Sequence, residues 1–207
     1  TIREIHHRVK NNLQTVAALL RLQSRRMDVP EARAALEEAM RRVATIALVY
    51  ESLSQTLDEE VEFDDMVGRA LRLAGDVASA DTSVRTVRTG SFGLVPAEDA
   101  TPLALILTEL VTNAVEHGLA KQETGTVEVA VERDGSALRI VVSDDGVGMP
   151  DGDVARAGKA AKSGLGSQIV QTLVTNELGG TIEWSPRPGG GTQVVLALVL
   201  RDGNRQG

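Results

Sequence analysis

Hydrophobic residues recur every three or four positions through the first 57 residues, which predicts two amphipathic helices. In residues 2–27 the apolar positions are Ile2, Ile5, Val9, Leu13, Val16, Leu20 and Met27. Residues 28–30 interrupt this pattern, and a second helix follows with Leu36, Met40, Val43, Ala47, Tyr50 and Leu57 on one stripe. Two helices joined by a short turn form a hairpin. Pairing with a second copy would cover the flanks of both stripes, so we expect a homodimer with a four-helix bundle.

Beyond about Val61 the pattern changes to shorter runs of helical and β-like periodicity. Helical spacing covers residues 66–78, 97–117 and 167–178, and β-rich runs cover residues 84–89, 126–131, 138–143, 181–185 and 192–200. Asp134-Gly135 is a turn signal between two β-rich runs, and Gly118 follows a predicted helix. Because strands and helices do not alternate strictly, we expect an α+β fold in which a helical layer covers a mixed sheet.

The charge is unevenly distributed, which favours two units with different tasks. Residues 1–57 carry nine Lys/Arg and six Asp/Glu, whereas the rest of the chain carries thirteen Lys/Arg and twenty-three Asp/Glu. Together with the change in periodicity, this predicts one unit over residues 1–58 and a second over residues 59–207. The acidic second unit and the low aromatic content, 2%, argue against direct binding of nucleic acid.

Composition narrows the possible chemistry further. The sequence contains no Cys, which excludes disulfides and thiolate nucleophiles. No window of 18 residues is uninterruptedly apolar, so we expect no membrane-spanning segment in this chain. The sequence begins with Thr1 and shows no signal-peptide pattern, so we expect a fragment of a longer cytoplasmic protein.

The first candidate for chemistry is the segment from His6 to Asn12 in the first predicted helix. At about 100° per residue, His7 lies about 160° from the centre of the apolar stripe and His6 about 60° from it. We therefore expect His7 to be exposed, with Asn11 one turn along the same face. A neutral, exposed imidazole is a nucleophile toward a phosphoryl group, and Asn11 would orient the ring. This favours His7 over His6 as a phosphoacceptor; the alternative is two surface histidines on a basic helix.

A row of polar residues on an otherwise apolar helix is the second candidate. Glu109, Asn113 and His117 are spaced by four residues and share one helix face. Glu and Asn supply the hard oxygen ligands that Mg²⁺ prefers, and His117 would reach a phosphate. The alternative is a solvated stripe.

Two glycine-containing segments complete the set of candidates. Asp144-Asp145-Gly146-Val147-Gly148 follows directly after an apolar β-rich run, where an Asp accepts a hydrogen bond from an exocyclic amine such as that of adenine. Gly164-Leu165-Gly166 precedes a predicted helix, whose N-terminal amide groups would face a phosphate. The alternatives are an ordinary turn for the first segment and a helix start for the second.

In this order the features resemble the ATP-binding domain of the GHKL superfamily, which includes gyrase, Hsp90, MutL and histidine kinases. Residues 109–114 resemble its N box, residues 144–148 its G1 box and residues 164–166 its G2 box. The resemblance covers residues 61–200. It implies an α/β-sandwich (Bergerat) fold that binds ATP and Mg²⁺, with residues 149–163 as a lid over the nucleotide.

The resemblance also implies a role for each site residue. Asp144 would read the adenine with support from Thr192, and Asn113 would hold Mg²⁺, with Glu109 ordering its water shell or acting as a base. The remaining contacts to the nucleotide would come from His117, Gly146, Gly148, Lys162, Ser163, Gly164, Leu165 and Gly166.

The first helix identifies a branch of that superfamily. The segment from Glu4 to Gln14 is similar to the phosphoacceptor motif of the HisKA_2 histidine kinases. This similarity implies a sensor histidine kinase core that autophosphorylates on His and passes the phosphoryl group to an Asp of a response regulator, in this family an RNA-binding regulator of the ANTAR type.

One departure from the histidine kinase pattern and two alternative functions remain open. Arg8 follows His7, where the commoner histidine kinases have an acidic residue that assists proton removal. The general base is therefore not assigned, and Glu109 is a candidate. A GHKL ATPase or a serine kinase of the anti-sigma type would need no phosphoacceptor helix. A non-catalytic dimerisation module with a degenerate nucleotide site is the second alternative.

Overall fold

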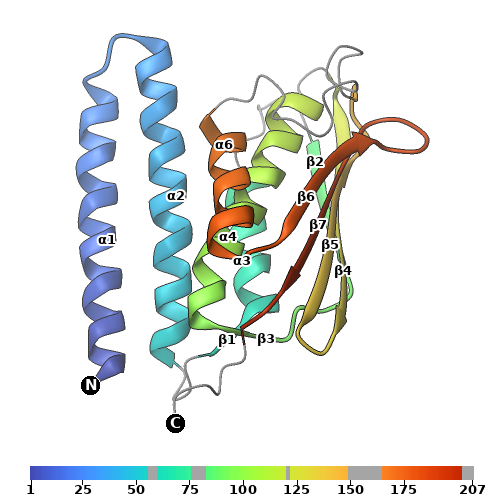
Figure 1. Ribbon diagram of the computed structural model, residues 1–207. Helices are drawn as coiled ribbons and strands as arrows, with labels where there is room; N and C mark the ends of the chain where they lie inside the picture. The colour runs from blue at the N-terminus through green and yellow to red at the C-terminus, as the bar shows by residue number, and fades with distance from the viewer. Residues whose placement is uncertain (56–59, 76–82, 120–121, 149–164, 202–207) are drawn as a thin grey trace.

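The computed structural model describes residues 1–55, 60–75, 83–119, 122–148 and 165–201 (Figure 1). Its helices are α1 (Ile2–Arg25), α2 (Pro30–Gln55), α3 (Phe63–Gly75), α4 (Ala97–Asn113) and α6 (Leu165–Thr172), with π-helical turns η1 (Ala114–Gly118) and η2 (Leu173–Glu177). Its strands are β1 (Glu60–Glu62), β2 (Ser83–Thr89), β3 (Leu94–Pro96), β4 (Thr124–Asp134), β5 (Ala137–Asp144), β6 (Thr181–Pro186) and β7 (Thr192–Val199). No helix within these ranges has both the length and the apolar composition required to span a bilayer.

Five strands form a mixed sheet in the order β2-β4-β5-β7-β6. β2 and β4 are parallel, because the chain returns through β3 and α4 before it enters β4, and the other three pairs are antiparallel. The predicted turn at Asp134-Gly135 is confirmed, since Asp134 pairs with Ala137 and Gly135 has a φ of +60°. The expected α+β class with a mixed sheet is correct.

The molecule is layered, with the sheet on one side and the hairpin on the other (Figure 1). Helices α3, α4 and α6 pack together and cover one sheet face, where alternate valines of β4 (Val127, Val129 and Val131) enter the core. α2 packs against α3 and α4, and α1 packs along α2. α2 therefore lies between α1 and the helical layer.

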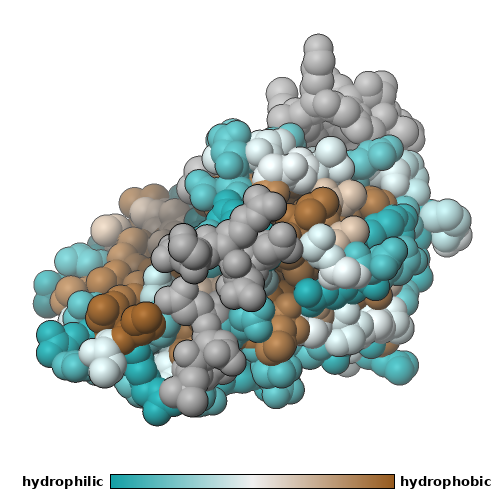
Figure 2. Space-filling model, turned by 60° about the horizontal axis from the view of Figure 1, so that its bottom comes forward, coloured by the Kyte–Doolittle hydropathy of each residue, from teal (hydrophilic) through white to brown (hydrophobic). Residues whose placement is uncertain are grey.

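The hairpin buries little of its own apolar surface. In α1 the one buried residue is Ser24, and the side chains that face α2, such as Val9 and Leu13, are half-buried. The exposed apolar residues of α1 are Ile2, Ile5, Val16, Leu19 and Leu22. Figure 2 shows hydrophobic surface on the hairpin side of the molecule, at the left of the view. This chain alone leaves one apolar face of α1 uncovered.

The structure corrects several boundaries expected from the sequence. The helix expected over residues 97–117 is confirmed, but its last turn is π-helical, since the Leu119 amide donates to the Ala114 carbonyl at 3.0 Å. The helix expected over residues 66–78 begins at Phe63. β1 and β3 were not expected, because three residues are too few to show a period of two. The expected boundary at residue 58 lies outside the described residues.

Candidate functional site

Asp144 ends β5 and its side chain is buried, with the residue 4% exposed. Its Oδ1 accepts hydrogen bonds from the backbone N–H groups of Gly146, at 2.9 Å, and Thr192, at 3.4 Å. Burial raises the pKa of the Asp144 carboxyl, against the opposing effect of these two hydrogen bonds. The carboxylate is thus fixed through Oδ1, which leaves Oδ2 to accept a hydrogen bond from a ligand.

Glycines from three segments enclose this carboxylate. A Cβ at Gly118 would lie 2.7 Å from Asp144 Oδ1, and one at Gly191 would lie 1.9 Å from the Asp144 carbonyl oxygen. A Cβ at Gly146 would lie 2.0 Å from the carbonyl oxygen of Gly118. At each of these glycines a Cβ would displace its neighbours, so the end of η1, the loop after β5 and the start of β7 approach each other closely enough to form a cradle around Asp144.

The polar row of Glu109, Asn113 and His117 lies along α4 and η1, and η1 ends at Gly118 in this cradle. Glu109 is 5% exposed, Asn113 is half-buried and His117 is exposed. The row is therefore not a uniformly solvated stripe. At a rise of about 1.5 Å per residue, Glu109 and Gly118 lie about 14 Å apart along the helix axis. α4 and η1 together thus connect the Asp144 cradle with a second group of residues around Glu109.

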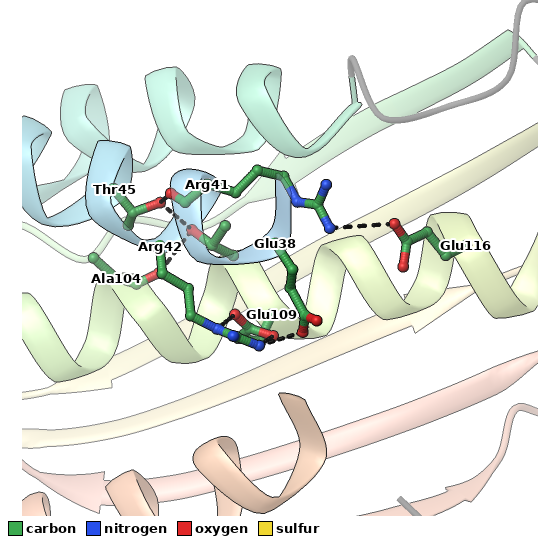
Figure 3. A network of polar contacts seen from close by, with 8 residues as sticks. Glu38, Arg41, Arg42, Thr45, Ala104, Glu109 and Glu116 are labelled. Carbon is green, nitrogen blue, oxygen red and sulfur yellow. Dashed lines mark hydrogen bonds and ion pairs between the residues drawn. The ribbon is translucent and has the colours of Figure 1, made fainter. Parts of the chain in front are cut away.

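That second group joins three elements (Figure 3). Arg42 of α2 donates from Nε to Glu109 Oε1 at 2.6 Å and from Nη2 to Glu109 Oε2 at 3.1 Å. The same Nη2 donates to Glu38 Oε1. A Cβ at Gly166, the second residue of α6, would lie 2.6 Å from Glu109 Oε2. The predicted N-box glutamate and the G2-box glycine are therefore in contact.

Arg42 and Glu38 are not among the site residues predicted from the sequence. A signal was present, because Glu38, Arg42, Thr45, Val49 and Leu53 recur at spacings of three or four residues and form a second stripe on α2. Thr45, Val49 and Leu53 are buried. This mixed polar and apolar stripe is the face of α2 that packs on the C-terminal unit.

Two further contacts connect α2 with η1 and with α4 (Figure 3). Arg41 Nη2 lies 3.3 Å from Glu116 Oε1, and the hydroxyl of Thr45 donates to that of Thr108 at 3.4 Å inside the interface. The hydroxyl of Thr45 is also within 3.0 Å of the Arg41 carbonyl. The hairpin is therefore attached to α4 by polar contacts at several levels.

The hairpin histidines differ in exposure in the way that the helical spacing predicts. His7 is exposed, and so is Asn11 one turn later. His6 is half-buried, with its ring 5.7 Å from that of Tyr50 in an edge-to-face contact. His6 Nδ1 is buried and has no hydrogen-bond partner among the described residues. His7 is thus the more accessible of the two imidazoles.

The structure does not bring all predicted site residues together. Asp144, Gly146 and Thr192 meet at the cradle, where Gly148, with a φ of +77°, lies near Gly191. His7 lies on α1, which α2 separates from α4 (Figure 1).

The lid expected over residues 149–163, with Lys162 and Ser163, and also Gly164, lie outside the described residues. Leu165 begins α6.

The residues at the site fit a nucleotide with a metal ion. The cradle presents one carboxylate oxygen between glycine backbones, which suits a flat base with an exocyclic amine. Asn113 and Glu109 offer hard oxygen ligands. Among the described residues no group of three His, Cys, Asp or Glu side chains can hold a metal by itself. A Mg²⁺ here would accordingly take most of its ligands from phosphate and water.

Comparison with known proteins agrees with this geometry. Residues 98–202 match the model of the histidine kinase-, DNA gyrase B- and HSP90-like ATPases. The chain belongs to this family. Residues 4–75 match the HisKA_2 histidine kinase model, so the hairpin resembles the corresponding part of that group. The ATPase family thus accounts for most of the α/β sandwich, and the HisKA_2 match covers the hairpin before it.

Individual proteins that resemble this chain are also histidine kinases. The chain is 53% identical over 201 residues to the sensor histidine kinase PdtaS of Mycolicibacterium smegmatis, and 48% identical to PdtaS of Mycobacterium tuberculosis. These matches cover 97% of this chain but 40% and 39% of the relatives, so the chain spans about two fifths of their length. The histidine kinase domain from Erythrobacter litoralis EL346 blue-light activated histidine kinase has a TM-score of 0.68 and 26% identity, covering 95% of this chain and 89% of that domain.

Proposed function

We propose that this chain is the catalytic core of a sensor histidine kinase, with residues 1–58 as the dimerisation and phosphotransfer unit and residues 59–207 as the ATP-binding unit. It would transfer the γ-phosphoryl group of ATP to His7 and then to an Asp of a response regulator. The observation that carries the proposal is that one chain presents both an exposed imidazole, on α1, and a buried carboxylate in a glycine cradle, at Asp144.

The cradle selects adenine by hydrogen-bond polarity. Asp144 Oδ1 is occupied by the amides of Gly146 and Thr192, so Oδ2 accepts from the exocyclic amine of adenine. Guanine carries a carbonyl oxygen at the corresponding position, which would face the carboxylate and repel it. The half-buried Thr192 supports the base through its hydroxyl or a bridging water.

The phosphates extend along α4 toward Glu109 and the start of α6. Asn113 would hold Mg²⁺, with Glu109 near its water ligands, and the bound metal would neutralise charge on the phosphates. The backbone amides of Leu165 and Gly166, at the N-terminus of α6, would receive the phosphate oxygens, together with that of Gly164. His117, Lys162 and Ser163 supply further donors on the phosphate side.

The first chemical step is an in-line displacement. A ring nitrogen of His7 attacks the γ-phosphorus, the bond from that phosphorus to the bridging oxygen breaks, and ADP leaves with that oxygen. The imidazole loses its N–H proton to a base, for which Glu109 is the candidate. In the second step a carboxylate oxygen of the receiver Asp attacks phosphorus, the P–N bond breaks, and His7 regains a proton.

The two reacting sites must approach each other for this step. In this arrangement α2 stands between α1 and α4, so either the hairpin moves relative to the ATP-binding unit or His7 comes from a second copy. A homodimer through the exposed apolar face of α1 is compatible with both. At about 100° per residue, His7 and Ile5 point about 160° apart around α1, so pairing through Ile5 leaves the imidazole accessible.

The partner that receives the phosphoryl group would dock on the hairpin near His7. We propose a receiver domain, and the HisKA_2 resemblance favours an ANTAR-type regulator that binds RNA. The chain itself would not bind nucleic acid, because its C-terminal unit is acidic.

Labelling with γ-³²P ATP and Mg²⁺ tests the proposal. We expect the wild-type chain to incorporate label, His7→Gln to lose it completely, and His6→Gln to retain it. ATP binding by calorimetry should be unchanged in His7→Gln, which shows that the loss concerns the acceptor. Labelling that persists in His7→Gln and vanishes in His6→Gln would reverse the assignment.

The stability of the label separates the alternatives. Phosphohistidine is labile in acid and stable in base, whereas phosphoserine is stable in acid. Acid-stable label would support the serine kinase reading, and ATP hydrolysis without any label would support a GHKL ATPase. Transfer of label to a purified receiver domain completes the test.

A further inference from the structure

The Glu109 carboxylate, which the proposed reaction uses, is held by a residue of the hairpin (Figure 3). The guanidinium of Arg42 reaches both carboxylate oxygens, at 2.6 Å from Nε and 3.1 Å from Nη2. This two-pronged geometry fixes the plane of a carboxylate as well as its position. Glu38, one turn earlier on α2, accepts a hydrogen bond from the same guanidinium and holds the Arg42 side chain in place.

The pair is shielded from water. The side chains of Glu109 and Arg42 are 6% and 15% exposed. Burial lowers the pKa of Arg42, but hydrogen bonds and charge from Glu109 and Glu38 outweigh this and raise it above its ordinary value. The guanidinium therefore stays charged. If it were removed, Glu109 would keep its buried position without a charge partner, which is costly.

The backbone of α6 limits the carboxylate on its other side. The position of a Cβ at Gly166 is 2.6 Å from Glu109 Oε2 and 3.7 Å from Arg42 Nη2. Glu109 is thus enclosed between the guanidinium and the N-terminal turn of α6, where the phosphates are proposed to bind. Rotation of the carboxylate away from this turn would break at least one of its two hydrogen bonds to Arg42.

We propose that Arg42 is a positioning residue for phosphoryl transfer: it holds Glu109 in one orientation beside the N-terminus of α6. This inference rests on the proposed function. It means that the ATP-binding unit does not complete its own site, because α2 of the hairpin supplies the group that orients Glu109, from 67 positions earlier in the chain.

A neighbouring ion pair provides a matched control. Arg41 is adjacent to Arg42 on α2 and pairs with Glu116 at 3.3 Å, in a contact that also joins the hairpin to the α4–η1 helix. Glu116 is exposed and is not part of the proposed machinery. Loss of Arg41 therefore weakens the same interface without touching Glu109.

The experiment compares labelling rates of the full chain at saturating ATP and Mg²⁺. We expect Arg42→Gln to lower the rate about 10–100-fold, the range found for groups that orient a reactive residue. The KM for ATP should change little, because the contacts at Asp144 are intact. Arg41→Gln should label at the wild-type rate. Arg42→Lys should recover part of the rate, since Lys keeps the charge but lacks the two-pronged geometry.

A double-mutant cycle decides whether Arg42 acts through Glu109. In the background of Glu109→Gln, the change Arg42→Gln should cause no further loss of rate. A loss of equal size in both backgrounds would overturn the inference, because Arg42 would then act independently of Glu109. A faster rate in Arg42→Gln would overturn it too, since the ion pair would then be a restraint on transfer.

The same four chains are compared by urea unfolding, which needs no activity. The unfolding midpoint should fall in Arg42→Gln and should not fall further when the same change is made in Glu109→Gln. If no such coupling is found, the contact is absent in solution and the inference fails whatever the labelling shows. A wild-type chain that takes up no label would instead overturn the proposed function.

Discussion

The hairpin and the C-terminal unit use their hydrophobic residues differently. Within the described residues, the hairpin contributes Val49 and Leu53 to the buried core, both from α2, and every other buried apolar side chain belongs to the C-terminal unit. α1 instead exposes an apolar face that includes Val16 and Leu19. A periodic stripe therefore forms an internal core in one region and an exposed apolar surface in the other.

The proposed functions are divided between the hairpin and the C-terminal unit in the same way. The C-terminal unit builds the proposed adenine cradle from backbone and a single carboxylate within one chain. The hairpin carries the proposed acceptor His7 and, through Arg42, holds Glu109 of the proposed nucleotide site, but it leaves an apolar face of α1 exposed. The predictions below separate the two regions.

The largest effect is expected from Asp144→Asn in the C-terminal unit. The amide oxygen would keep the hydrogen bonds to Gly146 and Thr192, which places the NH₂ group where Oδ2 faces the adenine amine. Two donors would then oppose each other, and ATP affinity by calorimetry should fall by at least about a hundredfold. Unchanged affinity would show that Asp144 does not contact the base.

The same variant has an opposite effect on stability. The pKa of the Asp144 carboxyl is higher in the folded than in the unfolded chain, so the folded state binds its proton more tightly. Its contribution to stability is favourable below the ordinary Asp pKa and is lost as pH rises through the raised value. The variant Asp144→Asn has no buried carboxyl to ionise and so avoids this loss of stability. Its thermal unfolding midpoint at pH 7 should therefore be higher than that of wild type. A lower midpoint in the variant would contradict a raised pKa of the Asp144 carboxyl in the folded chain.

A second prediction concerns the hairpin. Leu19→Glu places a charge on the exposed apolar face of α1, where the leucine is 58% exposed in the single chain. Burying that charge in a dimer is unfavourable, so the dimer dissociation constant by analytical ultracentrifugation should rise at least about tenfold. ATP affinity should not change.

The control for that variant is Gln14→Glu, which adds the same charge on the polar side of α1, where Gln14 is exposed. We expect its dimer constant to stay near the wild-type value. Equal effects of the two variants would show that the apolar face is not the dimer interface.

The smallest effect is expected from Gly118→Ala at the rim of the cradle. The new methyl group would lie 2.7 Å from Asp144 Oδ1, so the carboxylate must shift, and ATP affinity should fall roughly tenfold, equivalent to about 1.4 kcal/mol. The matched variant is Gly68→Ala on α3, where the nearest atom would be an Arg72 nitrogen at 3.8 Å. It should bind ATP normally and gain about 0.5–1 kcal/mol of stability. Equal ATP affinities in the two variants would contradict the close packing at Asp144.

Most of the fold followed from local patterns. The two hairpin helices, the long apolar helix of Glu109 and the β4–β5 turn are set by spacing, glycine and turn residues that act over a few positions. The exposure of His7 relative to His6 followed from the helical angle alone. The π turn after Asn113 did not, because nothing in residues 114–118 distinguishes it from an ordinary last turn of α-helix.

What the sequence determined by itself was therefore the class of fold, the order of the candidate motifs and the exposed face of α1. Only the tertiary structure decided that Arg42 pairs with both Glu109 and Glu38, that Gly166 abuts the Glu109 carboxylate, and that α2 stands between His7 and the Asp144 cradle. The physical reason is the separation along the chain over which each kind of interaction acts. Periodicity and turn chemistry act between near neighbours, whereas an ion pair between α2 and α4 depends on how two separately formed elements pack together.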